Sequence, residues 1–207
     1  MPHDVISEIQ VNNEWRDGEF AKFKINSAGV DENLWCRMCI PMIYAHWEGF
    51  VIDAFKILLR HLNTLQIPAN KTPTNLVVVS LGDSYKSLSG KQSFNQRIDF
   101  TERFAQCLNT HIKFQTRINT KANLRLDVLK EIYSMFNLNH EKFECIEADI
   151  NRLVQVRNCI AHGENSFMPT SDNLNTYIKA VRKGMDLVLE EIDDFLCAEG
   201  YLLKETG

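Results

Sequence analysis

Apolar residues recur at three- and four-residue intervals along almost the whole chain, and strict two-residue alternation is rare. This spacing is typical of helices that bury one face, whereas alternation would indicate strands. The pattern predicts helical segments at residues 4–24, 31–66, 94–113, 124–136, 142–162 and 172–199. We therefore expect an all-α fold, an up-and-down bundle of five or six helices.

Two local features refine this picture. Asp31 is placed to cap the second helix, which Pro41 is expected to kink or restart. Residues 67–93 depart from the helical pattern, because they hold two prolines, two glycines and many polar residues. Within them "LVVVSL" has the composition of a short strand, although one strand makes no sheet. We interpret residues 67–93 as an insertion or long loop between helices.

The totals exclude several classes of protein. A length of 207 residues suits one domain, residues 1–207, with a sizeable core. The net charge of -4 argues against a generally basic nucleic-acid coat, but a local basic cleft remains compatible with it. The polar N-terminus does not resemble a signal peptide, and charged residues interrupt the most apolar stretch, "CIPMIYAHWEGFVIDAF". We expect no membrane span, and six cysteines as reduced thiols in a cytoplasmic protein.

An arginine occupies the apolar face of the segment "LVQVRNCIAHGE", residues 153–164. At about 100° per residue, Arg157 projects near the centre of the apolar arc. The arc itself comprises Ile146, Ile150, Leu153, Val154, Ile160 and Ala161. An unpaired guanidinium inside a core costs several kcal/mol, so Arg157 needs an acid or an opening to water.

Glu48 is the candidate acid. It lies within the most coherent apolar arc of the second helix, with Ala45, Ile52, Phe55 and Leu59. Opposite charges on two apolar faces predict a buried Glu48–Arg157 pair. From the residues alone, a pair that only fixes the register of the bundle is as good an interpretation as a functional one.

The same helix is expected to end at His162, with Gly163 as the residue that follows the cap. Asn158 and His162 lie four apart and are neighbours, whereas Arg157 and His162 point about 140° apart. Arginine and histidine therefore share a site only if the arginine reaches round, the last turn distorts, or a second chain contributes. Such a set can cleave a phosphodiester without metal: histidine moves protons and arginine stabilises the phosphate. A plain capping role is the simpler interpretation of a histidine at a helix end.

Three blocks of the sequence resemble a known family. Arg157-Asn158, three residues and then His162 resemble the R-x4-6-H motif of the HEPN superfamily, and the wording around it is similar to the RiboL-PSP and MAE-like branch. "YAHWEGFV" (44–51) and "NLRLDVLKEIYSMFNL" (123–138) resemble that branch's second helix and the stretch before its motif. The resemblance extends from Asp31 to about Phe167.

The resemblance implies an α-helical bundle that forms a homodimer, so that both motifs line one cleft. Many members are metal-independent endoribonucleases of toxin–antitoxin or phage-defence systems, so RNA and an antitoxin or defence-system protein are the implied partners. Carried over by position, Arg157 and His162 would be catalytic, Asn158 would support them, and Glu48 would position the arginine. Other members are non-catalytic binding modules, and in that alternative Glu48–Arg157 is structural.

The remaining candidates have simpler explanations. Cys36 and Cys39 have metal-ligand spacing, but no second pair completes a zinc site, so two buried thiols are expected. No phosphate-binding glycine loop is present, and we expect neither cofactor nor metal. His46 is expected to be packed or partly exposed. Four cations recur every four residues, at Lys113, Arg117, Lys121 and Arg125. A solvated face is the simpler interpretation of that stripe, and contact with an RNA backbone is the alternative.

Overall fold

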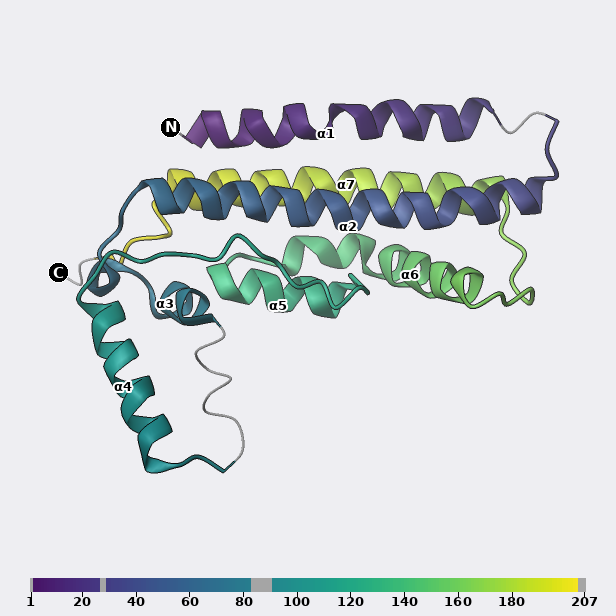
Figure 1. Ribbon diagram of the computed structural model, residues 1–207. Coiled ribbons are helices and arrows are strands. Elements are labelled where there is room, and N and C mark those ends of the chain that lie inside the picture. Colours follow the sequence, from purple (N-terminus) through teal and green to yellow (C-terminus); the bar gives the residue numbers. More distant parts are fainter. Residues whose placement is uncertain (1, 27–28, 83–90, 205–207) are drawn as a thin grey trace.

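The computed structural model describes residues 2–26, 29–82 and 91–204. Within these ranges the chain forms seven α-helices and no β-strand (Figure 1). They are α1 (Pro2–Ile25), α2 (Glu32–Thr64), α3 (Thr74–Leu81), α4 (Phe94–Leu108), α5 (Leu126–Phe136), α6 (Glu147–Ala161) and α7 (Ser171–Cys197), with 3-10 turns η1 (Ala69–Lys71) and η3 (Glu141–Ile146). The all-α prediction is confirmed. The helix beyond the expected six is α3.

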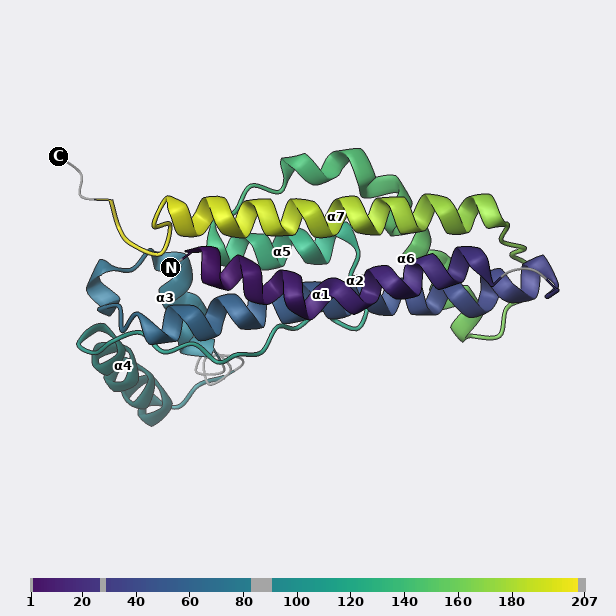
Figure 2. The same ribbon diagram turned by 90° about the horizontal axis from the view of Figure 1, so that it is seen from above.

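The three long helices, α1, α2 and α7, lie side by side and pack against one another (Figures 1 and 2). On the side of α2 away from α1, the shorter α5, η3 and α6 complete the bundle, with α6 packed on both α2 and α7. The core between these layers is aromatic and aliphatic. Its largest fully buried side chains include Trp47, Tyr133, Phe50, Phe55 and Phe143.

Helix α2 forms the axis of the bundle and begins where the sequence predicts. The Asp31 side chain accepts a hydrogen bond from the Leu34 amide at 2.9 Å, which satisfies one of the free N–H groups of the first turn. Pro41 lies inside the helix, which neither ends nor restarts there. In the described part of the chain, no helix combines the length and apolar character needed to span a membrane.

The segment "LVVVSL" is a helix, which corrects the suggestion of a strand. It forms most of α3, which starts directly after Pro73. The described residues offer it no neighbouring strand, whereas a helical turn brings Leu76, Val77 and Leu81 to one side, where all three are buried. Helix α3 contacts α5. Residues 83–90 of the expected insertion lie outside the described ranges.

The helix predicted at 94–113 ends earlier, at Leu108, and the chain then runs largely extended to Arg125, interrupted by a bend at Thr116 and a turn at Lys121 and Ala122. Asn63 of α2 fixes this extended segment by a pair of hydrogen bonds. Its amide nitrogen donates to the Phe114 carbonyl at 3.0 Å, and its amide oxygen accepts from the Phe114 N–H at 2.7 Å. Nearer the start, the Ile112 N–H donates to the Ile67 carbonyl at 2.8 Å. The four cations at Lys113, Arg117, Lys121 and Arg125 therefore do not lie on a helix.

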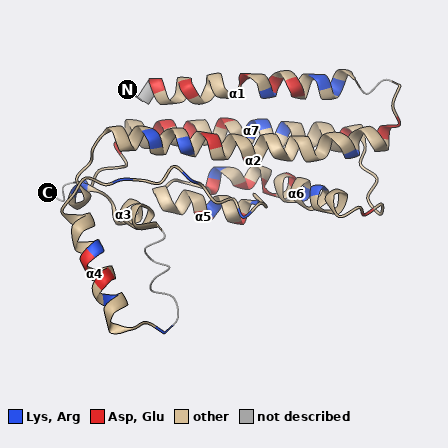
Figure 3. Ribbon diagram, in the orientation of Figure 1, with Lys and Arg blue, Asp and Glu red and all other residues tan. Residues whose placement is uncertain are grey.

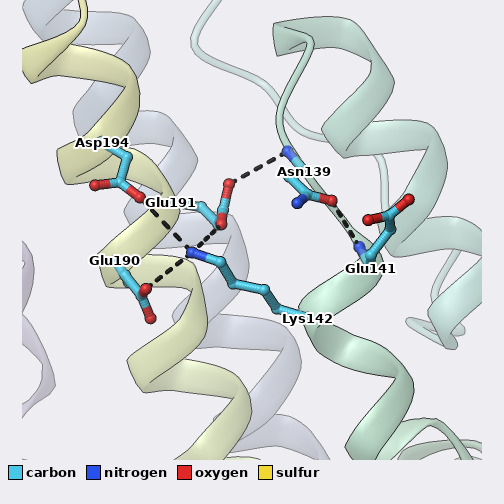
Figure 4. Close-up of polar contacts among 6 residues, drawn as sticks. All are labelled: Asn139, Glu141, Lys142, Glu190, Glu191 and Asp194. Atoms are coloured by element: carbon cyan, nitrogen blue, oxygen red, sulfur yellow. Dashed lines mark hydrogen bonds and ion pairs between the residues drawn. The ribbon is translucent and has the colours of Figure 1, made fainter.

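Turn η3 is joined to α7 by a cluster of charges (Figure 4). Lys142 lies 2.8 Å from carboxylate oxygens of both Glu190 and Glu191 and 3.7 Å from Asp194. Glu191 is buried, and its other oxygen accepts the Asn139 N–H at 3.2 Å. Hydrogen bonds to Glu190 and Glu191 raise the pKa of Lys142. The cluster holds in place the chain that leads into α6.

Candidate functional site

Helix α6 carries the motif and ends in a defined cap. His162 is the capping residue, and Gly163 follows it with a φ of +76°. The Gly163 N–H donates to the Ile160 carbonyl at 3.1 Å, and the Glu164 N–H donates to the Cys159 carbonyl at 2.9 Å. This pair of bonds is the Schellman motif, which favours glycine because the residue after the cap is left-handed. The prediction for Gly163 is confirmed, and His162 lies exposed at the helix end.

Arg157 is half-buried, one helical turn before that end. The centre of its guanidinium lies 3.8 Å from the centroid of the Tyr44 ring, within the range of a cation–π contact. Its Nη1 donates to the Asn158 side-chain oxygen at 2.8 Å, and its Nη2 donates to the Ala122 carbonyl at 3.1 Å. Arginine has five N–H donors. The described residues therefore orient this group without occupying all its donors.

The predicted ion pair between Glu48 and Arg157 is wrong: no ion pair joins them in the part of the chain that the structure describes. A Glu48 oxygen accepts instead from the Tyr44 hydroxyl at 2.9 Å and from the Thr120 hydroxyl at 2.6 Å. Tyr44 precedes Glu48 by one helical turn, so the two lie on one face of α2. The Tyr44 ring contacts the guanidinium of Arg157, and the Tyr44 hydroxyl contacts the carboxylate of Glu48. Glu48 thus does not bind Arg157 directly, and Tyr44 contacts both of them.

Tyr44 belongs to the site, although it was not among the residues predicted for it. It is buried, and its hydroxyl accepts the Leu124 N–H at 2.8 Å while donating to Glu48. Burial raises the pKa of Tyr44 to about 12, so the hydroxyl keeps the proton that it donates. One signal in the sequence is the four-residue spacing of Tyr44 and Glu48, which places them on one helix face.

A strained turn, residues 120–123, supplies the carbonyl that Arg157 binds. Lys121 and Ala122 both have positive φ, +56° and +52°, which costs non-glycine residues roughly 1–3 kcal/mol each. The Asn123 N–H closes the turn on the Thr120 carbonyl at 3.1 Å. The Asn123 side-chain oxygen also accepts from the Asn158 amide at 3.2 Å. The turn is therefore fixed to Glu48 through Thr120 and to Asn158 through Asn123.

The imidazole of His162 has no hydrogen bond or ion pair with any other described residue, Arg157 included. The loop that follows it is nevertheless held. Arg37 of α2 donates to the Glu164 carbonyl at 2.8 Å and to the Phe167 carbonyl at 3.2 Å. Arg152 of α6 lies 4.6 Å from the centroid of the Phe167 ring. The structure thus joins Arg157 to Asn158 directly and leaves His162 exposed at the end of the same helix. Tyr44 links Arg157 to Glu48.

The other candidates take the places expected of structural residues. Cys36 and Cys39 are buried, and burial raises the pKa of Cys39 to about 11. Among the described side chains no group of three or more His, Cys, Asp or Glu is arranged to hold a metal ion. His46 is packed among aromatic rings of α1, Trp15, Phe20 and Phe23.

Comparison with known proteins identifies the family. The family model described as RiboL-PSP-HEPN matches residues 11–198, which extends the likeness from the three blocks of the sequence to most of α1 and to α7. No curated protein and no solved structure matches the chain significantly. The matched range contains the whole of α2 and α6, and with them every residue of the candidate site. The chain belongs to the RiboL-PSP-HEPN family.

Proposed function

We propose that this protein is a metal-independent endoribonuclease. In this reaction His162 takes the proton from a ribose 2′-hydroxyl, and the 2′-oxygen attacks the adjacent phosphorus. The bond to the 5′-oxygen breaks and that oxygen takes up a proton, which leaves a 2′,3′-cyclic phosphate and a 5′-hydroxyl end. Arg157 stabilises the negative charge on the phosphate oxygens as it builds up. Asn158, Tyr44 and Glu48 hold the guanidinium in position.

The observation that carries this proposal is a guanidinium that is oriented but not neutralised. The Tyr44 ring, the Asn158 side chain and the Ala122 carbonyl fix its plane, and none of them is an anion. If Glu48 had formed the expected ion pair, the positive charge of Arg157 would already be neutralised within the bundle. Because Glu48 is engaged by two hydroxyls instead, the charge of Arg157 remains for an anionic ligand.

We place the reaction in a homodimer, because His162 and Arg157 of one chain are not in contact. His162 is exposed at the end of α6, where a second copy can approach it. In a symmetric pair, each histidine faces the arginine of the other chain across one cleft. The proposal extends to the setting that the family resemblance implies: a toxin–antitoxin or phage-defence system, an antitoxin or other partner protein, and a cytoplasmic location.

The test is cleavage of a defined RNA in the presence of EDTA. The native protein should cut it and leave cyclic phosphate ends, and it should leave DNA of the same sequence intact. His162→Ala should abolish cleavage with an unchanged urea denaturation curve, because the side chain is exposed and has no partner among the described residues. Cleavage that EDTA stops, or that survives in His162→Ala, would refute the proposal.

Arg157→Ala separates the enzyme from a non-catalytic binding module. In a module where the Glu48–Arg157 pair is structural, the loss of Arg157 orphans Glu48 and costs about 3–5 kcal/mol of the free energy of unfolding. In the observed arrangement Glu48 keeps both of its hydrogen bonds. The cost should then be about 1–2 kcal/mol, for one cation–π contact and two hydrogen bonds at a half-exposed site. Cleavage should be lost all the same.

A further inference from the structure

The chain leading to the site has an unusual charge balance. Residues 103–126 hold five of the 23 Lys and Arg residues and none of the 27 Asp and Glu residues. The protein as a whole carries a net charge of -4, so this stretch is a positive segment in a negative molecule. Figure 3 shows its basic positions along the extended chain that passes α2 toward α5 and α6.

The path of residues 112–120, which is largely extended and bends at Thr116, decides where those charges point. Ile112, Phe114 and Thr120 are buried against the bundle, while the intervening Lys113 and Arg117 are exposed. A spacing of four residues is even, so it keeps cations on one side of an extended chain as well as of a helix. The outward-facing side chains at alternate positions are Lys113, Gln115, Arg117 and Asn119, and every one of them can donate hydrogen bonds.

The segment is fixed to α2 at both ends, by Asn63 at Phe114 and by Glu48 at Thr120. It therefore presents its cations in a set order. Four extended residues span about 13 Å at ~3.3 Å each, and because of the bend at Thr116 the backbones of Lys113 and Arg117 lie less than that apart, so the two side chains can contact different phosphates. Lys121 follows at the strained turn, where it pairs with Glu131 at 2.6 Å. The next residue, Ala122, holds Arg157 through its carbonyl.

We propose that the outward face of residues 113–121 is a binding track for the phosphate backbone of a single RNA strand, which it delivers to Arg157. The inference rests on the proposed function for the identity of the ligand. Lys113 and Arg117 form no hydrogen bond or ion pair with other described residues, so both charges are available. A polyanion with evenly spaced phosphates neutralises such a row, and release of its counterions drives binding without selecting a sequence.

The experiment measures binding apart from cleavage. A fluorescent single-stranded RNA is titrated with the full chain carrying His162→Ala, and anisotropy is read at several salt concentrations. The track variant adds Lys113→Ala and Arg117→Ala to this background. The control adds Lys22→Ala and Lys24→Ala, which remove the same charge from α1, on the opposite side of α2 (Figure 1).

Loss of two phosphate contacts should lower the slope of log affinity against log salt by about 1.4, and affinity by about 25-fold at 0.1 M salt. The control variant should bind as the His162→Ala parent does. Equal affinities of track and control variants, or equal binding of a polyglutamate of matched charge, would overturn the track.

If His162→Ala abolishes cleavage while the track variant binds normally, the track alone fails. If the native chain cleaves nothing while the track variant binds weakly, the proposed function alone fails.

Discussion

Tyr44 joins two charged residues that do not meet each other. Its ring lies under the guanidinium of Arg157, and its hydroxyl donates to Glu48 while accepting the Leu124 N–H. Because the hydroxyl and the ring serve different partners, the two roles can be separated by substitution. The side chain is buried, so both partners are held at fixed positions relative to α2.

Tyr44→Phe and Tyr44→Leu should therefore behave differently. Tyr44→Phe keeps the ring but leaves the Leu124 N–H without its acceptor, and the free energy of unfolding should fall by about 1–3 kcal/mol. Its rate of RNA cleavage should stay close to that of the native protein. Tyr44→Leu also removes the ring that orients Arg157, and cleavage should fall at least tenfold. Urea denaturation and an RNA cleavage assay measure the two effects, and equal cleavage by both variants would contradict the role of the ring.

At the scale of elements, the contact between α1 and α2 contains charged and titratable groups within an apolar surface. Arg16 is buried and binds Asp53 at 2.9 Å, and it passes over Gly49, where a Cβ would lie 3.2 Å from its Nη2. About one turn before Gly49 on α2, the Nε2 atom of His46 lies 2.9 Å from the Oε2 atom of Glu19. The two pairs fix the register of α1 on α2.

Burial lowers the pKa of His46 below its ordinary value of 6.5, and this outweighs the opposing effect of Glu19. As pH falls through about 6.5, the unfolded chain takes up a proton that folded His46 takes up only at lower pH. The free energy of unfolding should therefore fall between about pH 7.5 and pH 5. In His46→Phe this decline should be shallower. It should not vanish, because the pKa of His61 is also lowered, chiefly by burial. Urea denaturation at several pH values tests this, and an unchanged slope in the variant would count against it.

At the scale of the whole molecule, Trp47 connects the packing of the bundle to the site. Its ring lies against Gly184 of α7, where an added Cβ would come within 2.9 Å of the ring. Its indole N–H donates at 3.2 Å to the carbonyl of Leu124, the residue that follows the strained turn. The separation of α2 and α7 therefore sets the position of the turn that binds Arg157.

Gly184→Ala should destabilise the protein, in contrast to Gly18→Ala. At Gly184 the new methyl group meets Trp47 and Ile146 in a packed core, which costs about 1–3 kcal/mol before any gain in helix propensity. At Gly18, on the exposed face of α1, a Cβ meets nothing within 4 Å. That substitution should stabilise the helix by up to about 1 kcal/mol. Thermal or urea denaturation of the two variants should give shifts of opposite sign.

The helices of the bundle could be predicted because their signals are local. The cap at Asp31, the end of α6 at Gly163 and the apolar face of α2 each depend on residues within a few turns of one another. The segments whose secondary structure was predicted wrongly depend on partners that are distant in the sequence. "LVVVSL" is helical because it packs on α5, and the chain after Leu108 leaves the helical path because Asn63 and Glu48 of α2 bind Phe114 and Thr120.

By itself, then, the sequence determined that Arg157, Asn158 and His162 lie in the last turns and the cap of one helix. It also determined that Arg157 interrupts the apolar face of that helix. Spacing along a helix is enough to fix those relations. Only the tertiary structure decided which groups Arg157 and Glu48 contact. Glu48 and Arg157 lie on helices whose separation allows a tyrosine ring between them, and the carbonyl of a distant turn takes the place of the expected carboxylate. Charge pairing depends on the distance between elements, because the attraction between two charges weakens as they separate. Neither helix alone determines that distance.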